Sequence, residues 1–595
     1  MLYFLGAWLL LAIACGITGL GWLNCWRVEG FERLDDRVIV AMWLGLVTQA
    51  IALLSASFFV ALSPWVGIAI ALGSVGLALA LPQTRADLSQ LCTFLNPKFY
   101  RTCLLIAIIA AGFMGSKVFW IDTGLYHYSA VQWLAEYGAV PGLGLLNSRL
   151  GWPSAWFALA APFNPPLLDS RGTVVVNGFI LLLAIAHWWL AVRQIFGKKE
   201  ANWSDWLGFF AYPGLLGLFV LGRLVAGRIR IPATWTFVNI VVSVSQDFVV
   251  ALLCVLVAWA IAVIYARNAA QNLNNRIIPL FLAAAAFAMK PTAMPLLAIA
   301  TLFYLIPRPW RLQRFGVAGI VIAAFAVPTM GFGIVVSGCP LSPLRVMCWD
   351  LPWTTPLPGE VAKSLGLQDG SWQAWYGSTP NPQFYWFWML KKWLRDSTLF
   401  AFCCLVSGVS WAVWAIIAFK QHKLRWQPLA SQYWIDAIGA LGLVFLTWRS
   451  PLIRFGIGYA VLIPAVLLAM VFENQARSFP QGFVPGQLSH KLRRWSLMLL
   501  WGIAGVIVLR SVILSWFWLP QPLFEVLVAP AQVNDVRYFY PLAKVSGIES
   551  REMLCWGAQL PCAEYEEPQN NNIKLRNPEA GISGGFVRAD YESGD

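Results

Sequence analysis

The chain has 595 residues, of which 59% are hydrophobic and only 12% are charged. A soluble chain would carry about twice that charged fraction, so this is not a string of soluble domains. The net charge of +14 does not by itself indicate a nucleic-acid ligand, because the basic residues must first be assigned to one side of a membrane or the other.

Apolar windows long enough to cross a hydrocarbon core of about 30 Å recur along the whole chain. They predict an all-α integral membrane protein with about 12–14 transmembrane helices. The chain opens without the basic segment of a cleavable signal peptide. The predicted spans are 2–23, 38–62, 66–81, 103–120, 173–192, 206–222, 246–266, 277–289, 291–307, 316–336, 398–419, 434–447, 456–472 and 496–519.

The loops between these spans fall into two alternating sets. One set is short and basic, with 21 Lys and Arg against 8 Asp and Glu: 24–37, 82–102, 193–205, 267–276, 308–315, 420–433 and 473–495. The positive-inside rule places this set in the cytoplasm and both termini outside. The rest of the chain has 21 basic and 20 acidic residues, so the net charge reflects topology and not nucleic-acid binding.

The outer loop 121–172 carries the densest group of polar side chains. Asp122 stands where the chain leaves a span, and Tyr126, His127 and Gln132 follow on an amphipathic, helical pattern. A Gly-rich stretch containing Arg149 comes next, and 154–163 predicts a second short interfacial helix. An acid, a phenol, an imidazole and an amide at a membrane surface indicate a functional site. The alternative for Asp122 is a structural helix cap.

Further charged residues lie at the predicted outer ends of later spans: Asp247, Lys290, Arg449 and Arg454. Cations at one leaflet are typical of a site for an anionic headgroup, since Arg can grip phosphate with two parallel hydrogen bonds. Snorkelling to lipid headgroups is the alternative. The outer loop 337–397 is rich in aromatic residues, which form an interfacial belt or stack on sugar rings.

Four cysteines lie in predicted outer segments, where an oxidising compartment allows disulfides. Cys339 is close in sequence to Cys348, and Cys555 is close to Cys562. The tail 520–595 is too small for a large core of its own, so we expect it to pack as a cap on the outer face.

A multispan chain with an acid in an early outer loop, followed by two interfacial helices, resembles the GT-C class of membrane glycosyltransferases. It is also similar to an uncharacterised bacterial family of multispan proteins that is frequent in cyanobacteria. The similarity rests on Asp122 to His127, 140–144 with 149–151, Asp247, Lys290, 338–343, 454–456 and 560–562. The chain departs from that pattern at Cys339, where an aromatic is expected, and at 450–452, where an acid is expected.

The resemblance implies a GT-C-like core over 103–519, extra transmembrane helices over 1–102 and an extracytoplasmic segment over 520–595. It implies an inverting enzyme of a bacterial plasma membrane that moves a hexosyl or pentosyl unit from a polyprenyl-phosphate donor to a glycan or lipid acceptor outside. Asp122 would be the general base, with Tyr126 and His127 orienting the reactants. Lys290 and Arg454 would stabilise the leaving phosphate, and the further substrate-binding residues would be Arg449, Arg149, Gln132 and Asp247.

Few acids accompany Asp122 in its loop, so a divalent metal cofactor is not favoured. Three other functions stay open. A transporter or flippase predicts internal repeats and mid-membrane polar residues. A polysaccharide polymerase or ligase relies on Arg instead of an outer Asp, and a structural partner in envelope assembly needs no catalytic acid.

Overall fold

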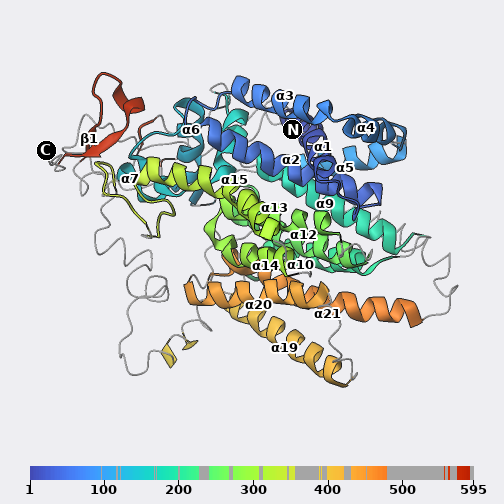
Figure 1. The fold of residues 1–595 in the computed structure, drawn as a ribbon. Coiled ribbons are helices and arrows are strands. Elements are labelled where there is room, and N and C mark those ends of the chain that lie inside the picture. The colour runs from blue at the N-terminus through green and yellow to red at the C-terminus, as the bar shows by residue number, and fades with distance from the viewer. Residues whose placement is uncertain are drawn as a thin grey trace, which may run out of the picture.

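The computed structural model describes residues 1–478, apart from 227–239, 355–386, 421–430 and shorter gaps, together with 573–589 and a few residues around Cys555 and Cys562. The described chain is almost entirely helical (Figure 1). Its helices up to residue 226 are α1 (Leu2–Cys25), α2 (Leu34–Ala56), α3 (Pro64–Ala80), α4 (Pro82–Phe94), α5 (Pro97–Met114), α6 (Tyr128–Glu136), α7 (Leu143–Leu146), α8 (Ala155–Ala160), α9 (Val175–Ile195) and α10 (Trp203–Ala226).

The later helices are α12 (Gln246–Ala266), α13 (Leu273–Met289), α14 (Met294–Leu305), α15 (Leu312–Ser337), α19 (Thr398–Lys420), α20 (Ser431–Arg449) and α21 (Ile453–Ser478). Two short antiparallel strands, β1 (Ile573–Leu575) and β2 (Phe586–Arg588), form the described part of the tail. Each predicted span up to residue 472 overlaps one of these helices, and 496–519 lies outside the described residues.

Within the described residues, six helices are long and apolar enough to cross a membrane, and the bent pair of α3 and α4 makes up to seven. The six are Leu2–Cys25, Leu34–Ala56, Arg171–Ile195, Gln246–Tyr265, Leu312–Ser337 and Arg454–Glu473. Several further apolar helices, such as Asn274–Met289, are shorter. The protein is therefore an all-α, multi-pass membrane protein, in which each helix satisfies its own backbone hydrogen bonds in the hydrocarbon.

Two sequence predictions of local structure were wrong. Residues 82–102 are not a loop, because α4 and the start of α5 occupy them. Helix α4 leaves α3 at an angle of 100°. The turn comes at Pro82, whose missing N–H ends the hydrogen-bond ladder of α3, and α4 is too polar to stay in the apolar layer. The span predicted to reach residue 120 ends at Met114, immediately before a glycine.

Helix α12 is the centre of the bundle. It is apolar on every face and almost completely buried, and it contacts α10, α13, α20 and α21. A helix without a polar face is stable only when neighbours surround it. The peripheral helices instead expose large apolar side chains, such as Ile320 (71% exposed) on α15 and Leu405 (65%) on α19, which suit contact with lipid chains.

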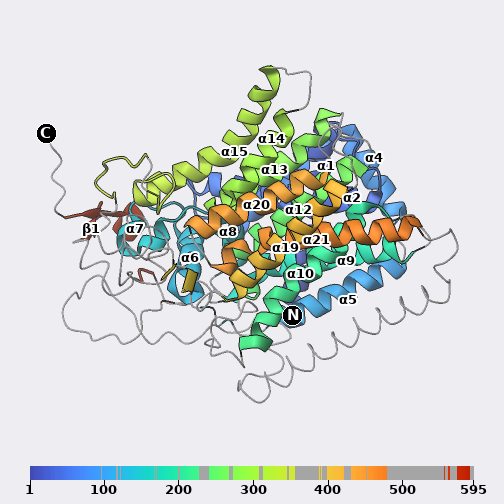
Figure 2. The ribbon, with the colours of Figure 1, turned by 90° about the horizontal axis from the view of Figure 1, so that it is seen from below.

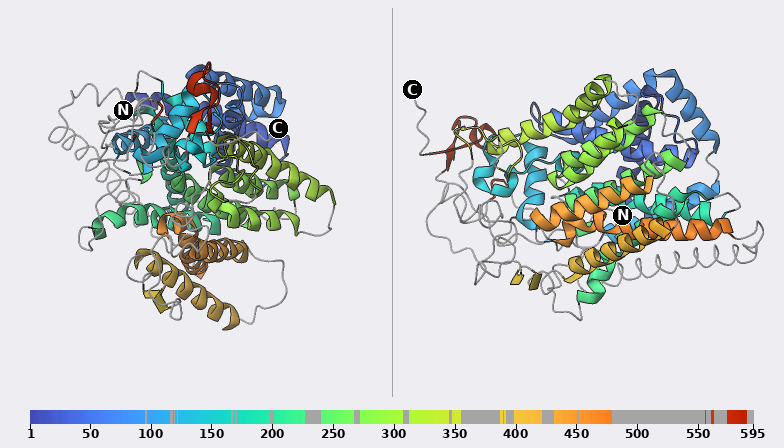
Figure 3. Two further views of the ribbon diagram at one scale, coloured as in Figure 1. Left: turned by 90° about the vertical axis from the view of Figure 1, so that its left-hand side faces the viewer. Right: turned by 60° about the horizontal axis from the view of Figure 1, so that its bottom comes forward.

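Segments predicted to lie outside meet at one end of the bundle. Figure 1 shows α6, α7 and β1 together there, and the views of Figure 2 and Figure 3 agree. Three backbone hydrogen bonds of 2.7–3.1 Å join these segments. Their donor N–H groups and acceptor carbonyls are Leu62 to Leu134, Ala139 to Ser57, and Gly142 to Val335. Strand β2 docks on the same loop, where Phe586 N–H donates to the Pro141 carbonyl at 3.0 Å. Gly142 has φ +76° and touches the Phe586 carbonyl, so a side chain there would block this docking.

Both cysteine pairs form disulfides, Cys339–Cys348 and Cys555–Cys562. The tail residues also contact the loop after α15, since Arg588 N–H donates to the Pro352 carbonyl at 3.0 Å and the Arg576 guanidinium lies over the Trp353 ring. The described part of the tail thus packs on the loops that are predicted to lie outside.

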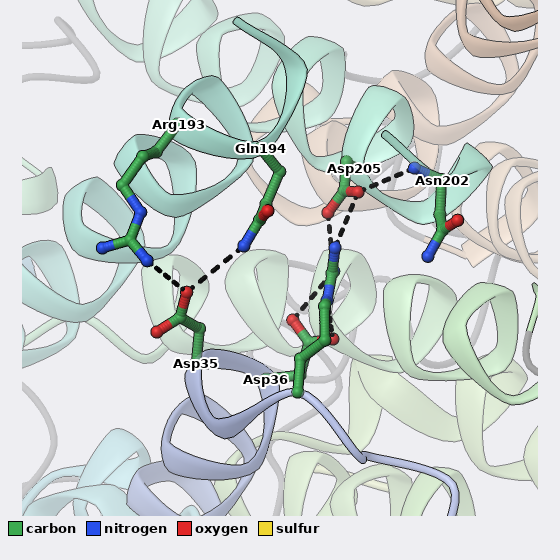
Figure 4. A network of polar contacts seen from close by, with 7 residues as sticks. Asp35, Asp36, Arg193, Gln194, Asn202 and Asp205 are labelled. Atoms are coloured by element: carbon green, nitrogen blue, oxygen red, sulfur yellow. Dashed lines mark hydrogen bonds and ion pairs between the residues drawn. The ribbon is translucent and has the colours of Figure 1, made fainter. Parts of the chain in front are cut away.

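Segments predicted to be cytoplasmic meet through ion pairs (Figure 4). Arg33, at the start of α2, donates to both oxygens of Asp36 at 2.6 and 3.0 Å and to both oxygens of Asp205 at 2.7 and 2.9 Å. Asp35 accepts hydrogen bonds from Arg193 and Gln194, which lie at the end of α9. Two of the loops predicted to be cytoplasmic, 24–37 and 193–205, therefore lie together.

We expect Arg33→Gln to lower the free energy of unfolding by about 3 kcal/mol or more, because it leaves the buried Asp36 and Asp205 without their counterion. The measurement is thermal or denaturant unfolding in detergent. Arg193→Gln is the matched control, since the Arg193 side chain is 44% exposed and such pairs are worth under about 1 kcal/mol. Equal losses in the two variants would contradict this difference.

Candidate functional site

Asp122 does not cap a helix. It directly precedes a π-helical turn, Thr123–His127, which runs on into α6, and its side chain makes no hydrogen bond to that turn. Its carboxylate instead accepts a hydrogen bond from Arg454, with 2.6 Å between Oδ2 and Nη1. The structural-cap alternative is therefore wrong for Asp122. Single π-turns are frequent at functional sites.

Four of the predicted site residues form one group, which we call the charge cluster: Asp122, Asp247, Lys290 and Arg454. The Lys290 ammonium donates to Asp247, and Arg454 Nε lies 4.0 Å from Asp247 Oδ2. Two acids and two cations thus meet although they are up to 332 positions apart in the chain. Their charges cancel, as buried charges in an apolar bundle require.

Local structure brings Asp247, Lys290 and Arg454 to helix ends. Asp247 lies in the first turn of α12, where the helix dipole favours an acid. Lys290 has an extended backbone between the end of α13 and a 3₁₀ turn, Pro291–Ala293, and the proline fixes this break. Arg454 lies in the first turn of α21, where the dipole disfavours a cation. The nearby acids are therefore needed to hold Arg454 in place.

Aromatic rings enclose the cations. Lys290 Nζ lies 4.0 Å from the centre of the Phe455 ring, and the Arg454 guanidinium carbon lies 4.7 Å from it. The same carbon is 5.4 Å from the Trp120 ring. The side chains of Asp122 and Arg454 are each 19% exposed, and that of Asp247 is 4% exposed. The cluster is thus shielded, with limited access to solvent at Asp122 and Arg454.

Tyr126 and His127 pack beside this cluster. Both are buried, and their ring centres are 4.4 Å apart. Tyr126 also meets the rings of Trp152 at 5.4 Å and Phe157 at 6.2 Å, while His127 Nδ1 is 3.4 Å from the Thr123 hydroxyl. The phenol and the imidazole therefore form an aromatic wall next to Asp122.

The protonation states follow from burial and from neighbouring charge. Burial alone would raise the pKa of the Asp122 carboxyl, but the neighbouring charges, that of Arg454 foremost, and the hydrogen bond from Arg454 together outweigh it and hold that pKa below its ordinary value. Burial raises the pKa of Tyr126 well above its usual range, and the charges of Asp122 and Asp247 raise it further. Burial lowers the pKa of His127 to about 3. At neutral pH the carboxylate is charged, and the phenol and the imidazole are neutral.

The other predicted site residues are not members of the cluster. Arg149 lies on a 3₁₀ turn, Ser148–Gly151, close enough for its charge to act on the Tyr126 phenol. Gln132 donates instead to Glu136 on its own helix at 3.0 Å. The side chain of Arg449 lies outside the described residues. Trp120, Phe455 and Trp152 were missed as site residues, although Phe455 directly follows Arg454 in the sequence.

Among the described residues, no three His, Cys, Asp or Glu side chains gather as metal ligands. The two acids of the cluster each face a cation. The expectation that the site works without a divalent metal stays a prediction.

Residues 1–461 match the family described as Domain of unknown function (DUF8201), and the chain belongs to this family. The match contains all four members of the charge cluster. It spans both the predicted extra helices 1–102 and most of the predicted core. No curated protein and no solved structure matches the chain.

We expect the stability of the protein to fall as the pH drops from about 6.5 toward 3, partly through His127. The unfolded imidazole binds a proton below about 6.5, whereas the folded one binds it only near pH 3, so the unfolded state gains protons first. One such group contributes a slope of up to about 1.4 kcal/mol per pH unit. His127→Gln should flatten the pH dependence of the melting temperature in this window. An unchanged profile would show that His127 is not the group responsible.

Proposed function

For this member of the family, we propose a membrane glycosyltransferase of the GT-C type. It moves a sugar from a polyprenyl-phosphate donor to a glycan or lipid acceptor on the extracytoplasmic face of a bacterial plasma membrane. The observation that carries the proposal is the arrangement of the charge cluster, in which an ionised acid, Asp122, is joined directly to a cation, Arg454, beside a second cation, Lys290. Transfer of a sugar from a lipid phosphate requires a base for the acceptor hydroxyl and cations for the leaving phosphate at one place.

Asp122 is the proposed general base. The acceptor hydroxyl oxygen attacks the anomeric carbon, the bond from that carbon to the phosphate oxygen breaks, and the electron pair stays on the phosphate. The hydroxyl proton passes to Asp122. A single displacement of this kind inverts the anomeric centre.

The charge balance of the cluster fits this step. A phosphodiester donor carries one negative charge, and the phosphate monoester that leaves carries up to two at neutral pH. Protonation of Asp122 removes one negative charge at the same moment. The total negative charge facing Lys290 and Arg454 is therefore unchanged, and these cations can exchange their interaction with the carboxylate for one with the phosphate.

The neighbouring residues have supporting roles in this proposal. Asp247 holds Lys290 in place. Tyr126 and His127, both neutral, supply a buried hydroxyl and ring that orient the reactants beside Asp122. Arg149 adds positive charge next to Tyr126, and Arg449 and Gln132 remain proposed substrate contacts on the same side. The exposed apolar side chains of the peripheral helices suit the lipid part of the donor.

The position of the cluster favours this proposal over a transporter. Its members lie in first turns and in a helix break at the predicted outer end of the bundle, whereas a transporter predicts polar residues near mid-membrane. A polymerase or ligase acting on lipid-linked sugars remains the second candidate, because Arg454 lies at the centre of the cluster.

We expect Asp122→Asn to lower sugar transfer by about 10² to 10⁴, the usual contribution of a general base. The measurement is release of polyprenyl phosphate when the purified full chain is incubated with a panel of polyprenyl-phosphate sugars and acceptors. Asp350→Asn is the matched control, because Asp350 is an exposed acid in another outer loop and should leave the rate unchanged.

The melting temperature of each variant establishes that loss of transfer is not loss of fold. Full activity in a folded Asp122→Asn protein would refute the role of Asp122 as base. Release of no lipid phosphate by the wild type from any donor, with chain growth from lipid-linked oligosaccharides instead, would favour a polymerase.

A further inference from the structure

Arg454 uses only part of its hydrogen-bonding capacity. Nη1 donates to Asp122, whereas Nε is buried and makes no hydrogen bond, with Asp247 Oδ2 at 4.0 Å from it. Arg33 at the opposite end of the bundle gives the comparison. It donates from Nε and from both terminal nitrogens to two carboxylates. Arg33 therefore uses its Nε as a donor, and Arg454 does not.

A second unpaired donor lies next to Arg454. Trp120 is 3% exposed, its indole N–H is buried without an acceptor, and its ring centre is 5.4 Å from the guanidinium carbon. Other buried indoles, such as Trp133, also lack an acceptor, but Trp133 packs against Tyr137 and Phe586. Trp120 differs because the charged group beside it has an unused donor as well.

The kind of ligand follows from the groups left unpaired. A buried donor without an acceptor costs about 1–3 kcal/mol, and more when it belongs to a charged group. Both unpaired groups here are donors, so the ligand that satisfies them must present an acceptor oxygen. A negatively charged oxygen suits a guanidinium best.

We propose that Arg454 Nε and the Trp120 indole N–H form a seat for one non-bridging phosphate oxygen of the donor, an inference that rests on the proposed function. One guanidinium then holds the base through Nη1 and the leaving phosphate through Nε. Trp120 is a substrate-binding residue that the sequence analysis did not identify.

This arrangement couples the two halves of the reaction. When Asp122 takes the proton of the acceptor, its attraction for Arg454 falls. At the same moment the phosphate gains the electron pair of the broken bond, and its attraction for Nε and the indole rises. Lysine could not take this part, because its point charge lacks the fixed, separate donors of a guanidinium.

The experiment measures binding of dimethylallyl phosphate, a water-soluble phosphate monoester, to the full chain in nanodiscs of neutral lipid by calorimetry. Trp120→Phe keeps an aromatic ring but removes the N–H, and we expect it to raise the Kd about tenfold. Arg454→Lys keeps the charge but removes Nε, and should raise the Kd at least as much. Since both groups bind the same oxygen, the double variant should lose less than the product of the two single losses.

Trp133→Phe is the matched control, because it removes another buried, unpaired indole N–H away from the cluster, and its Kd should stay within twofold of the wild type. Melting temperatures confirm that each variant is folded. Unchanged affinity in Trp120→Phe would overturn the seat, and so would an equal loss in Trp133→Phe.

The binding and transfer assays separate the two proposals. Phosphate binding that depends on Trp120 in a protein that transfers no sugar would uphold the seat and refute the transferase. Sugar transfer that depends on Asp122, together with phosphate binding that does not depend on Trp120, would uphold the transferase and refute the seat.

Discussion

The need to neutralise charge inside an apolar bundle governs both ends of this protein. At the predicted outer end, Arg454 in the first turn of α21 is held by Asp122, while Lys290 in the break after α13 is held by Asp247 in the first turn of α12. Each pair joins segments that are distant in the chain. Because an unpaired charge at these depths is costly, the pairs fix how the outer ends of α12, α13 and α21 meet the loop before α6.

The two ionic groups of the molecule differ in how fully they are bonded. Arg33 donates from all three guanidinium nitrogens to two carboxylates, which ties the start of α2 to the start of α10. The charge cluster is balanced in charge but leaves donors without acceptors at Arg454 and Trp120. The first arrangement is that of a structural clamp. The second is that of a site whose hydrogen bonds are completed by a ligand, and this difference underlies both proposals made above.

The sequence predicted the helices well, because a bilayer demands about 20 apolar residues for each crossing and these windows are visible without any tertiary information. It also predicted which loops lie together, through the excess of Lys and Arg. It failed where the chain changes direction. Helix α5 ends at Met114, immediately before a glycine, and not at residue 120. Helix α4 stands where a loop was predicted, because the chain turns at a proline and continues as a moderately polar helix.

For the site, the sequence determined which residues are costly in a membrane and that they stand at the ends of apolar segments, because charge at the end of an apolar window is read directly from composition. It could not determine their partners. Asp122 and Arg454 are separated by 332 positions, and their meeting depends on tertiary packing. The bond from Gln132 to Glu136 is an i,i+4 contact that helical spacing itself allows. Tertiary structure decided that Trp120 lies beside a guanidinium, because that contact joins segments far apart in the chain.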